Sequence, residues 1–309
     1  MPGGGIVEGM SETSREHVKA PNSPVVVGID GSASALAAAS WAAAECSRHR
    51  APLRLVHGYM LPANAYPEML IIADETRQAM EEQARAWLTE AAAAARAAAP
   101  EVEITTSVVS CGGAGLLIDE SATARLVVVG SRGHGTVTGL LVGSTAIALA
   151  AHGRCPVVVV RGTAAPEGPV VVGIDGSPTS EAAVAFAFEE ASARGAGLVA
   201  LMTSQDFTVD SAYNVSRMAT DWAQVEEDER RLLAQRLAGW QEKYPDVEVR
   251  RVVLRERPAR ALMRYGVDAQ LLVVGSHGRG GFMGMLLGST SQALVHHAPC
   301  PLAIVRPAG

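Results

Sequence analysis

Lysine is almost missing from this sequence, and its scarcity removes a large class of phosphate-binding proteins. Only Lys19 and Lys243 occur among 26 basic residues, and no G-x4-G-K-[ST] segment is present. A P-loop nucleotidase needs that lysine to reach the β- and γ-phosphates, so this class is excluded. The first apolar run is not followed by G-x-G-x-x-G, which excludes a dinucleotide-binding Rossmann domain.

Long apolar runs, a net positive charge and cysteine motifs are also lacking. No run approaches the roughly 20 apolar residues that span a bilayer, so we expect no membrane segment. A net charge of −6 argues against general nucleic-acid binding. The four cysteines (Cys46, Cys111, Cys155 and Cys300) form no C-x-x-C pair and no metal-ligand spacing. We therefore expect buried thiols in a reducing cytoplasm and no metal site built from cysteine and histidine.

What the sequence does contain is a duplication. Pro24–Ser32 (PVVVGIDGS) returns letter for letter at Pro169–Ser177, and Gly130–Thr145 returns with small changes at Gly275–Thr290. Both pairs are separated by 145 residues. A single offset leaves room for few net insertions, so the two halves are expected to share one fold.

The domain boundaries follow from the repeat and from local composition. A chain of 309 residues with 48% hydrophobic residues suits two domains of ordinary size. We predict a flexible arm over residues 1–22, which has no apolar core and carries three glutamates, so it is not a secretory signal. The domains are predicted at 23–162 and 169–309, joined by a small, proline-containing linker at 163–168.

Each half alternates apolar strands with helices. Strands are predicted in the first half at Val25–Ile29, Leu53–Tyr59, Val102–Val109, Leu126–Val129 and Val157–Val160, with helices at Ser32–Arg50, Asp74–Ala99, Gly115–Ala124 and Ser144–His152. The second half repeats this order from Val170 to Val305. Continuous apolar runs that stop at turn residues are typical of buried parallel strands. The expected fold class is α/β, with two tandem, doubly wound, five-stranded parallel-sheet domains of Rossmann-like type.

Two loops of each half should lie at the carboxyl ends of the strands, where such sheets bind ligands. The first loop carries Asp30 or Asp175. The second has the pattern G-x2-G-x9-G-S, formed by Gly130, Gly133, Gly143 and Ser144 and again by Gly275, Gly278, Gly288 and Ser289. Glycine leaves backbone N–H groups bare and permits positive φ, and a following helix start favours negative charge. This predicts a phosphate site in each half; an ordinary strand-to-helix turn, copied by duplication, is the alternative.

Several side chains of these loops have two interpretations. Ser144 and Ser289 either cap the helix that follows or donate to a phosphate oxygen. Asp30 and Asp175 either contact a ligand or cap the first helix of their half. Arginine and histidine beside the glycines, at 132 and 134 and in swapped order at 277 and 279, add positive charge near each site.

In the residues of these two loops, each half resembles a universal stress protein domain. The resemblance extends over about Val25–Arg161 and Val170–Arg306. The resemblance rests on the V-x-G-[IV]-D-G-S opening and on the glycine loop, which marks the ATP-binding subclass. It implies an adenine nucleotide alpha hydrolase-like fold. In that fold Asp30 and Asp175 lie beside the nucleoside, and the glycine loops hold ribose and phosphates. The backbone near Val56 and Leu201 would meet the adenine, although Met202 replaces the histidine found at this point in typical members.

The resemblance also implies a function and an assembly. The expected protein binds ATP with Mg²⁺, senses or buffers adenine nucleotide status, and regulates stress adaptation through an unknown protein partner. Family members pair through their last strand, so 157–160 should meet 302–305 in an internal pseudo-dimer, and two chains should form a homodimer. No nucleophile stands out beside a base. Two alternatives stay open: a slow Mg-dependent ATPase, with Asp30 or Asp175 as metal ligands, and a nucleotide-free scaffold.

Overall fold

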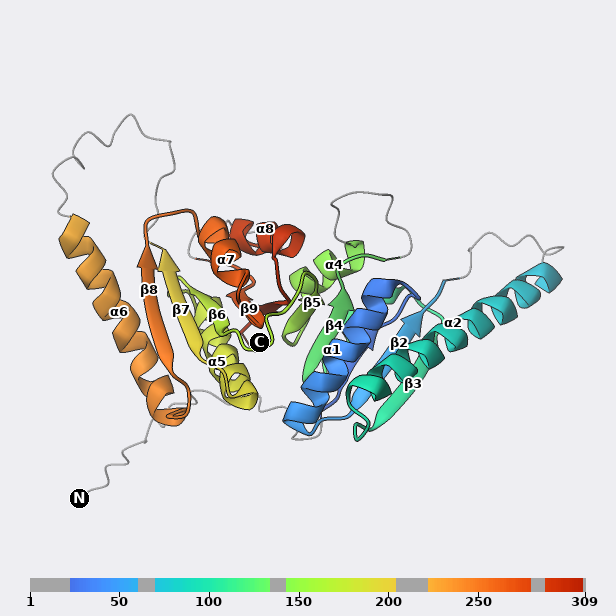
Figure 1. Ribbon diagram of the computed structural model, residues 1–309. Helices are drawn as coiled ribbons and strands as arrows, with labels where there is room; N and C mark the ends of the chain where they lie inside the picture. Colours follow the sequence, from blue (N-terminus) through green and yellow to red (C-terminus); the bar gives the residue numbers. More distant parts are fainter. Residues whose placement is uncertain (1–22, 61–69, 134–142, 204–221, 279–286, 308–309) are drawn as a thin grey trace, which may run out of the picture.

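The computed structural model describes residues 23–60, 70–133, 143–203, 222–278 and 287–307, and it contains two α/β domains (Figure 1). The first domain consists of β1 (Val25–Gly28), α1 (Ala33–His49), β2 (Leu53–Gly58), α2 (Leu70–Ala98), β3 (Ile104–Val109), α3 (Gly113–Glu120), β4 (Leu126–Gly130), α4 (Ser144–His152) and β5 (Val157–Val160). The second consists of β6 (Val170–Ile174), α5 (Pro178–Arg194), β7 (Leu198–Thr203), α6 (Trp222–Lys243), β8 (Val249–Leu254), α7 (Pro258–Gly266), β9 (Leu271–Gly275), α8 (Ser289–His297) and β10 (Leu302–Val305).

The strands form one continuous sheet of ten, in the order β3-β2-β1-β4-β5-β10-β9-β6-β7-β8. Neighbouring strands are parallel except β5 and β10, which run antiparallel. Val158 lies opposite Ala303, its own counterpart 145 residues on, so the two halves are related by an approximate twofold axis at this pair. The predicted α/β class is confirmed, and so is the meeting of 157–160 with 302–305.

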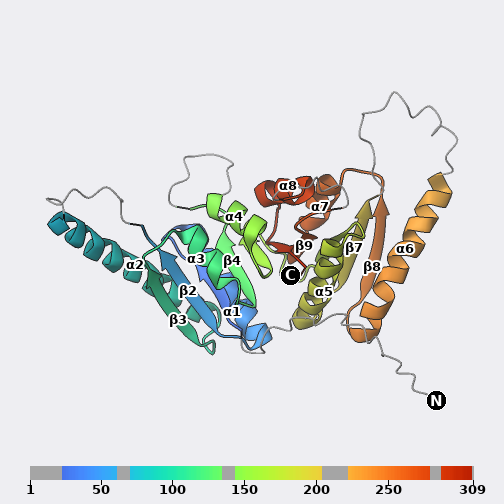
Figure 2. The ribbon, with the colours of Figure 1, turned by 180° about the vertical axis from the view of Figure 1, so that it is seen from behind.

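Helices cover both faces of the sheet, as the two opposite views show (Figures 1 and 2). Because side chains alternate along a strand, Val25 and Val27 enter the core beneath α1, α2, α5 and α6, whereas Val26 enters the core beneath α3, α4, α7 and α8. Both cores run through both domains. Within the described residues, no helix is long and apolar enough to cross a membrane.

Four predicted boundaries were wrong by two to four residues. The helix predicted at Asp74–Ala99 is α2, which begins four residues earlier, at Leu70. The helix predicted at Gly115–Ala124 is α3, which starts after an extended Gly112 and ends at Glu120. Beyond Glu120 the chain forms turns, in which the N–H groups of Ala122 and Thr123 bond three residues back, to Asp119 and Glu120. Val102 lies in a turn after α2 rather than in β3, because its N–H bonds to Ala99.

Arginines that follow β5 and β10 join the domains in a crossed manner. Arg161 donates to the carbonyl of Val295 near the end of α8, and Arg306 donates to the carbonyl of Ala151 near the end of α4. A cation is favourable at a helix C-terminus, where carbonyl groups lack helical partners. Each of these two helices is thus held at its last turn by the opposite domain.

The linker lies against the second domain. The N–H of Thr163 bonds to Pro299 and that of Ala165 to Ala269, at 3.0 and 3.1 Å. Gly162 has φ of +58°, and a Cβ atom at this position would collide with the backbone of Pro299. The link between the domains is therefore a packed segment with a required glycine.

Candidate functional site

The turn after β1 positions an aspartate at the carboxyl end of the sheet. The Oδ1 atom of Asp30 accepts from the backbone N–H of Ser32 at 3.0 Å and from its hydroxyl at 2.6 Å. The Ser32 hydroxyl in turn accepts from the N–H of Ala35 and caps α1. The twin residues Asp175 and Ser177 repeat this arrangement. The serine, not the aspartate, is therefore the helix cap, and the aspartate holds the serine in place.

The turn also requires a glycine. Gly31 has φ of +81°, a backbone conformation that disfavours L side chains. A Cβ atom there would overlap the indole of Trp87, which packs against the turn from α2. Gly176 has the same conformation, with φ of +78°. The D-G-S pattern thus specifies one rigid turn in both domains.

The structure brings the aspartate and the glycine loop together. A Cβ atom added to Gly133 would lie 2.6 Å from Oδ2 of Asp30, and one added to Gly278 would lie closer still to Oδ2 of Asp175. These residues are 103 positions apart in each half. The second glycine of each loop therefore faces the carboxylate across a gap too narrow for any side chain.

The first and third glycines have different surroundings. A Cβ on Gly130 would meet Ser34 and one on Gly275 would meet Thr179, so these two glycines allow close packing of the sheet on α1 and α5. Gly143 and Gly288 are the N-caps of α4 and α8, and neither helix has a side-chain cap. Ser144 and Ser289 are the first helical residues, so their hydroxyls do not occupy the capping position.

The absence of a side-chain cap leaves the start of each helix suited to an anion. The first N–H groups of an α-helix have no helical partners, and the helix dipole places partial positive charge there. The N–H of Gly143 bonds back to Ser131 at 3.2 Å and that of Gly288 to Ser276 at 2.9 Å, which brings the two ends of each loop together. The rest of the loops, with His134 and Arg279, lies outside the described residues.

Two hydroxyls that the sequence reading did not single out bind the loop to the first helix. Ser34 donates to the carbonyl of Arg132, and Thr179 donates to that of His277. Both stand two positions after the cap serine, in D-G-S-x-[ST], so the repeated hydroxyl was the available signal. These bonds position the carbonyl that directly precedes Gly133 or Gly278.

The end of β2 opens onto a cavity of about 370 Å³ in the first domain. Its walls come from the end of β2, the residue that follows this strand, and α2: His57, Tyr59, Thr76, Ala79, Met80, Gln83 and Trp87. His57 donates from Nδ1 to the carbonyl of Ile29 at 2.6 Å, because a carbonyl can only accept, and its ring meets Trp87 edge to face. The adjacent Val56 carbonyl accepts from the N–H of Ile29, and the Val56 side chain is buried on the other face of the sheet.

The second domain differs at this place. Met202 stands where the first domain has His57, and Leu232 where it has Trp87. Met202 is 4% exposed and belongs to the core beneath α5 and α6, and Leu201 is buried on the opposite face. The two sites therefore share the aspartate and the glycine loop but not the aromatic wall.

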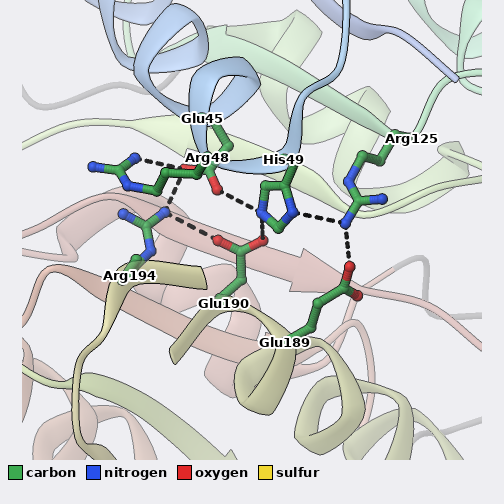
Figure 3. A network of polar contacts seen from close by, with 7 residues as sticks. All are labelled: Glu45, Arg48, His49, Arg125, Glu189, Glu190 and Arg194. Atoms are coloured by element: carbon green, nitrogen blue, oxygen red, sulfur yellow. Dashed lines mark hydrogen bonds and ion pairs between the residues drawn. The ribbon is translucent and has the colours of Figure 1, made fainter. Parts of the chain in front are cut away.

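A buried charge cluster lies where α1 and α5 meet at the domain interface (Figure 3). Glu45 and His49 come from α1, and Glu190 and Arg194 come from α5. Both carboxylates contact Nε2 of His49 at 3.0 Å, and Arg194 pairs with both. Arg48 adds a longer pair to Glu45, and Arg125 bridges Nδ1 of His49 and Glu189.

The cluster has the ligand spacing of a metal site but not its charge. Atoms of Glu45, His49 and Glu190 lie within 4.8 Å of one another. Three arginines already balance the three glutamates of the cluster, and Arg194 occupies the space beside both buried carboxylates. A divalent cation would add uncompensated positive charge, so we interpret the cluster as an ion-pair network that joins the domains.

Burial and mutual charge spread the pKa values of these groups. Burial and then the charge of Glu45 raise the pKa of Glu190 to about 7. Burial also acts to raise the pKa of Glu45, but His49 and Arg194 outweigh it and lower that pKa to about 2. For His49, burial disfavours the charged ring, yet the two carboxylates raise its pKa to about 9. The hydrogen bond from Arg125 to Nδ1 favours the neutral ring, because Nδ1 can accept a hydrogen bond only when the ring is neutral. The two buried carboxylates have the larger effect on the pKa of His49, since Arg125 is partly exposed.

Comparison with known proteins gives consistent matches along the whole chain. The model of the universal stress protein family matches residues 21–161 and 168–306. A universal stress protein of Mycolicibacterium smegmatis is 44% identical over 294 residues, covering 92% of this chain and 97% of the relative. One of Mycobacterium tuberculosis is 40% identical over 309 residues, covering 96% and 99%. The crystal structure of a universal stress protein from Archaeoglobus fulgidus superposes with a TM-score of 0.65 at 20% identity, covering 93% and 98%.

Proposed function

This chain belongs to the universal stress protein family as a tandem, two-domain member, and we propose that each domain binds ATP together with Mg²⁺. Binding then senses or buffers adenine nucleotide status and changes contacts with a protein partner during stress adaptation. The cytoplasm is the compartment we propose, because all four cysteines are thiols. We further propose that two chains form a homodimer.

One observation carries the proposal: in both domains, the strand-end aspartate and the second glycine of the loop face each other. A structural turn alone would not need a glycine opposite a carboxylate 103 residues away. Carboxylate oxygen suits Mg²⁺ or a ribose hydroxyl, and the N–H groups of a helix start suit phosphate. The residues that would hold Mg-ATP are Asp30, Gly133, Gly143 and Ser144 in the first domain, and Asp175, Gly278, Gly288 and Ser289 in the second domain.

The cavity beside β2 supports a base-binding role in the first domain. Its aromatic and apolar walls suit a planar heterocycle, since ring faces favour stacked or edge-on contacts. It lies next to Val56, where the resemblance expects the adenine. With Met202 and Leu232 in place of His57 and Trp87, the second domain should bind the base more weakly.

Regulation by binding fits the site better than rapid catalysis. The described residues of both sites are an aspartate, glycines and the serines that begin α4 and α8, which suit binding of an anion rather than activation of a nucleophile. A slow Mg-dependent ATPase stays the second candidate, and turnover above about 1 s⁻¹ would favour it. A scaffold that keeps the fold but binds no nucleotide is the third.

Thermal unfolding with and without Mg-ATP tests the proposal. A ligand at about 100 times its Kd stabilises by roughly 2.7 kcal/mol. Gly133→Ala and Gly278→Ala should abolish the shift, because the new methyl group fills the gap to the aspartate. Gly115→Ala and Gly239→Ala are matched controls, one in each domain, since a Cβ there meets nothing within 4 Å. Unchanged binding in the Gly133→Ala, Gly278→Ala double variant would contradict the site, and no shift in the wild type would favour the scaffold.

A further inference from the structure

The greatest charge difference between the two domains lies on β8 and α7. Residues 250–264 (RRVVLRERPARALMR) hold six arginines and one glutamate, a formal charge of +5 in a chain of net charge −6. The equivalent residues 105–119 (TTSVVSCGGAGLLID) hold no arginine and one aspartate. The elements themselves match, because β3 and β8, and α3 and α7, each begin 145 residues apart. The fold therefore does not require the arginines.

Four of these arginines form one surface, which we call the arginine face: Arg250, Arg257, Arg260 and Arg264. Arg257 caps α7, and the other two helical members follow at spacings of three and four, which places them on one side of the helix. The guanidinium groups of Arg250 and Arg264 lie over the ring of Tyr265, at 6.0 and 5.1 Å from its centroid. Tyr265 thus joins the strand to the helix.

The arginine face is exposed and only partly neutralised. All four members are exposed, and Arg264 pairs with Glu256. In the part of the chain that the structure describes, no carboxylate forms an ion pair with Arg250, Arg257 or Arg260. Neighbouring like charges repel, so this arrangement costs free energy in the isolated chain unless an anion covers it.

Protection of the sheet edge is the simplest alternative, and it does not account for the face. Charged side chains on an edge strand prevent pairing with other sheets. The other edge strand, β3, carries Thr105 and Thr106 at the positions of Arg250 and Arg251. Three members of the face, moreover, belong to α7 and its cap rather than to the edge strand.

We propose that the arginine face binds a short acidic segment of a partner protein. Guanidinium groups bind carboxylates in a bidentate manner, and stacking on Tyr265 holds two of them in place before binding. The part of α7 from Arg257 to Arg264 is about 10 Å long, which matches roughly three extended residues. Because the rest of the chain carries a charge of −11, a long polyanion would be repelled beyond the face. The proposal does not depend on nucleotide binding.

Fluorescence anisotropy with a labelled octaglutamate peptide tests this proposal on the full chain at low and physiological salt. The wild type should bind, more weakly at high salt because exposed charges are screened. Arg257→Glu/Arg260→Glu should weaken binding by about tenfold or more. The control Arg96→Glu/Arg154→Glu makes the same change of charge at exposed positions of the first domain and should alter binding less than about twofold.

Three results would overturn the proposal. The first is that the wild type does not bind octaglutamate at low salt, and the second is that the control variant loses as much affinity as Arg257→Glu/Arg260→Glu. The third is that the wild type binds an eight-phosphate oligothymidylate or phosphatidylserine vesicles more tightly than octaglutamate. Arg257→Gln/Arg260→Gln provides a second variant should charge reversal impair folding, and it should give an intermediate loss. A Mg-ATP thermal shift measured on the same variants separates the two proposals. If the shift disappears with the arginines, they belong to the phosphate site and the docking role is wrong.

Discussion

Glu45 and Glu190 occupy equivalent positions in the two domains, and their carboxylates meet at the interface, each 3.0 Å from Nε2 of His49. Duplication of one glutamate therefore placed two like charges side by side near the twofold axis. The partners at the next equivalent pair differ, His49 in one domain and Arg194 in the other, and together they supply the compensating charge. The divergence of the two copies at this point therefore supplies the charge that the paired glutamates need.

Removing Arg194 should destabilise the protein strongly. Arg194→Leu leaves two buried carboxylates with one partner fewer, and breaking a buried ion pair in this way costs about 3–5 kcal/mol. Urea unfolding measures the loss. Arg231→Leu, on the exposed surface of α6, should cost less than about 1 kcal/mol. Equal losses in the two variants would mean that the cluster does not hold the domains together.

Stability should fall as the pH rises from about 5 to 9. The pKa of Glu190 is raised from 4.5 to about 7, so its contribution is complete below pH 4.5 and is lost as the pH passes 7. The pKa of His49 is raised from 6.5 to about 9, so its contribution is complete below 6.5 and is lost through pH 9. Glu45 acts oppositely, and its contribution disappears as the pH falls from 4.5 towards 2.

The Glu190→Gln variant tests the part of this pH dependence of stability that the Glu190 carboxyl group causes. The variant has no carboxyl group to ionise at that position, so its melting temperature should decline less than that of the wild type between pH 4.5 and 7. The fall above pH 7, which His49 governs, should become smaller without disappearing, because Glu45 alone then raises the pKa of that ring. Parallel profiles over the whole range would show that Glu190 does not titrate near neutrality.

Alanine substitutions at Gly31 and Gly195 should distinguish the free-energy cost of backbone strain from that of steric overlap. Both have positive φ, but a Cβ on Gly195 meets nothing, whereas one on Gly31 overlaps Trp87. Gly195→Ala should therefore cost about 1–2 kcal/mol, from backbone strain alone. Gly31→Ala should cost at least about 1 kcal/mol more, because the indole must move. Similar free energies of unfolding for the two variants would mean that the Trp87 side chain moves aside at no cost in free energy.

Trp87→Leu should make the first domain resemble the second. The change copies Leu232 and removes one aromatic wall of the cavity, so ATP binding by the first domain should weaken about tenfold, the value of a lost aromatic contact of about 1.4 kcal/mol. Native mass spectrometry counts the bound nucleotides, and the second domain is the internal control. If the variant binds the same average number of nucleotides per chain as the wild type at the wild-type midpoint concentration, the base lies elsewhere.

Much of the fold could be predicted because the sequence contains the same domain pattern in two copies. Valine-rich runs ending in D-G-S or G-S specify strands, and the single offset of 145 forces both halves into one topology. The boundaries of α3 and β3 were less predictable, because alanine, glycine and threonine at 112–124 suit both helix and turn. Of the candidate site, Asp30 and the glycine loop were predicted from their pattern. The contact of Ser34 with the loop was not, since hydroxyls are common beside helix starts.

The sequence by itself determined the duplicated α/β architecture and the glycine turns, because these depend on local periodicity and on backbone freedom. The pairing of the last strands was implied only by the family resemblance. Only the tertiary structure decided which glycine faces Asp30, which one merely permits helix packing, and that Glu45, His49, Glu190 and Arg194 form one buried cluster. Such relationships arise between residues about 100 or more positions apart, and no local pattern encodes them. They depend on how helices pack on the sheet, which brings distant side chains within hydrogen-bonding distance.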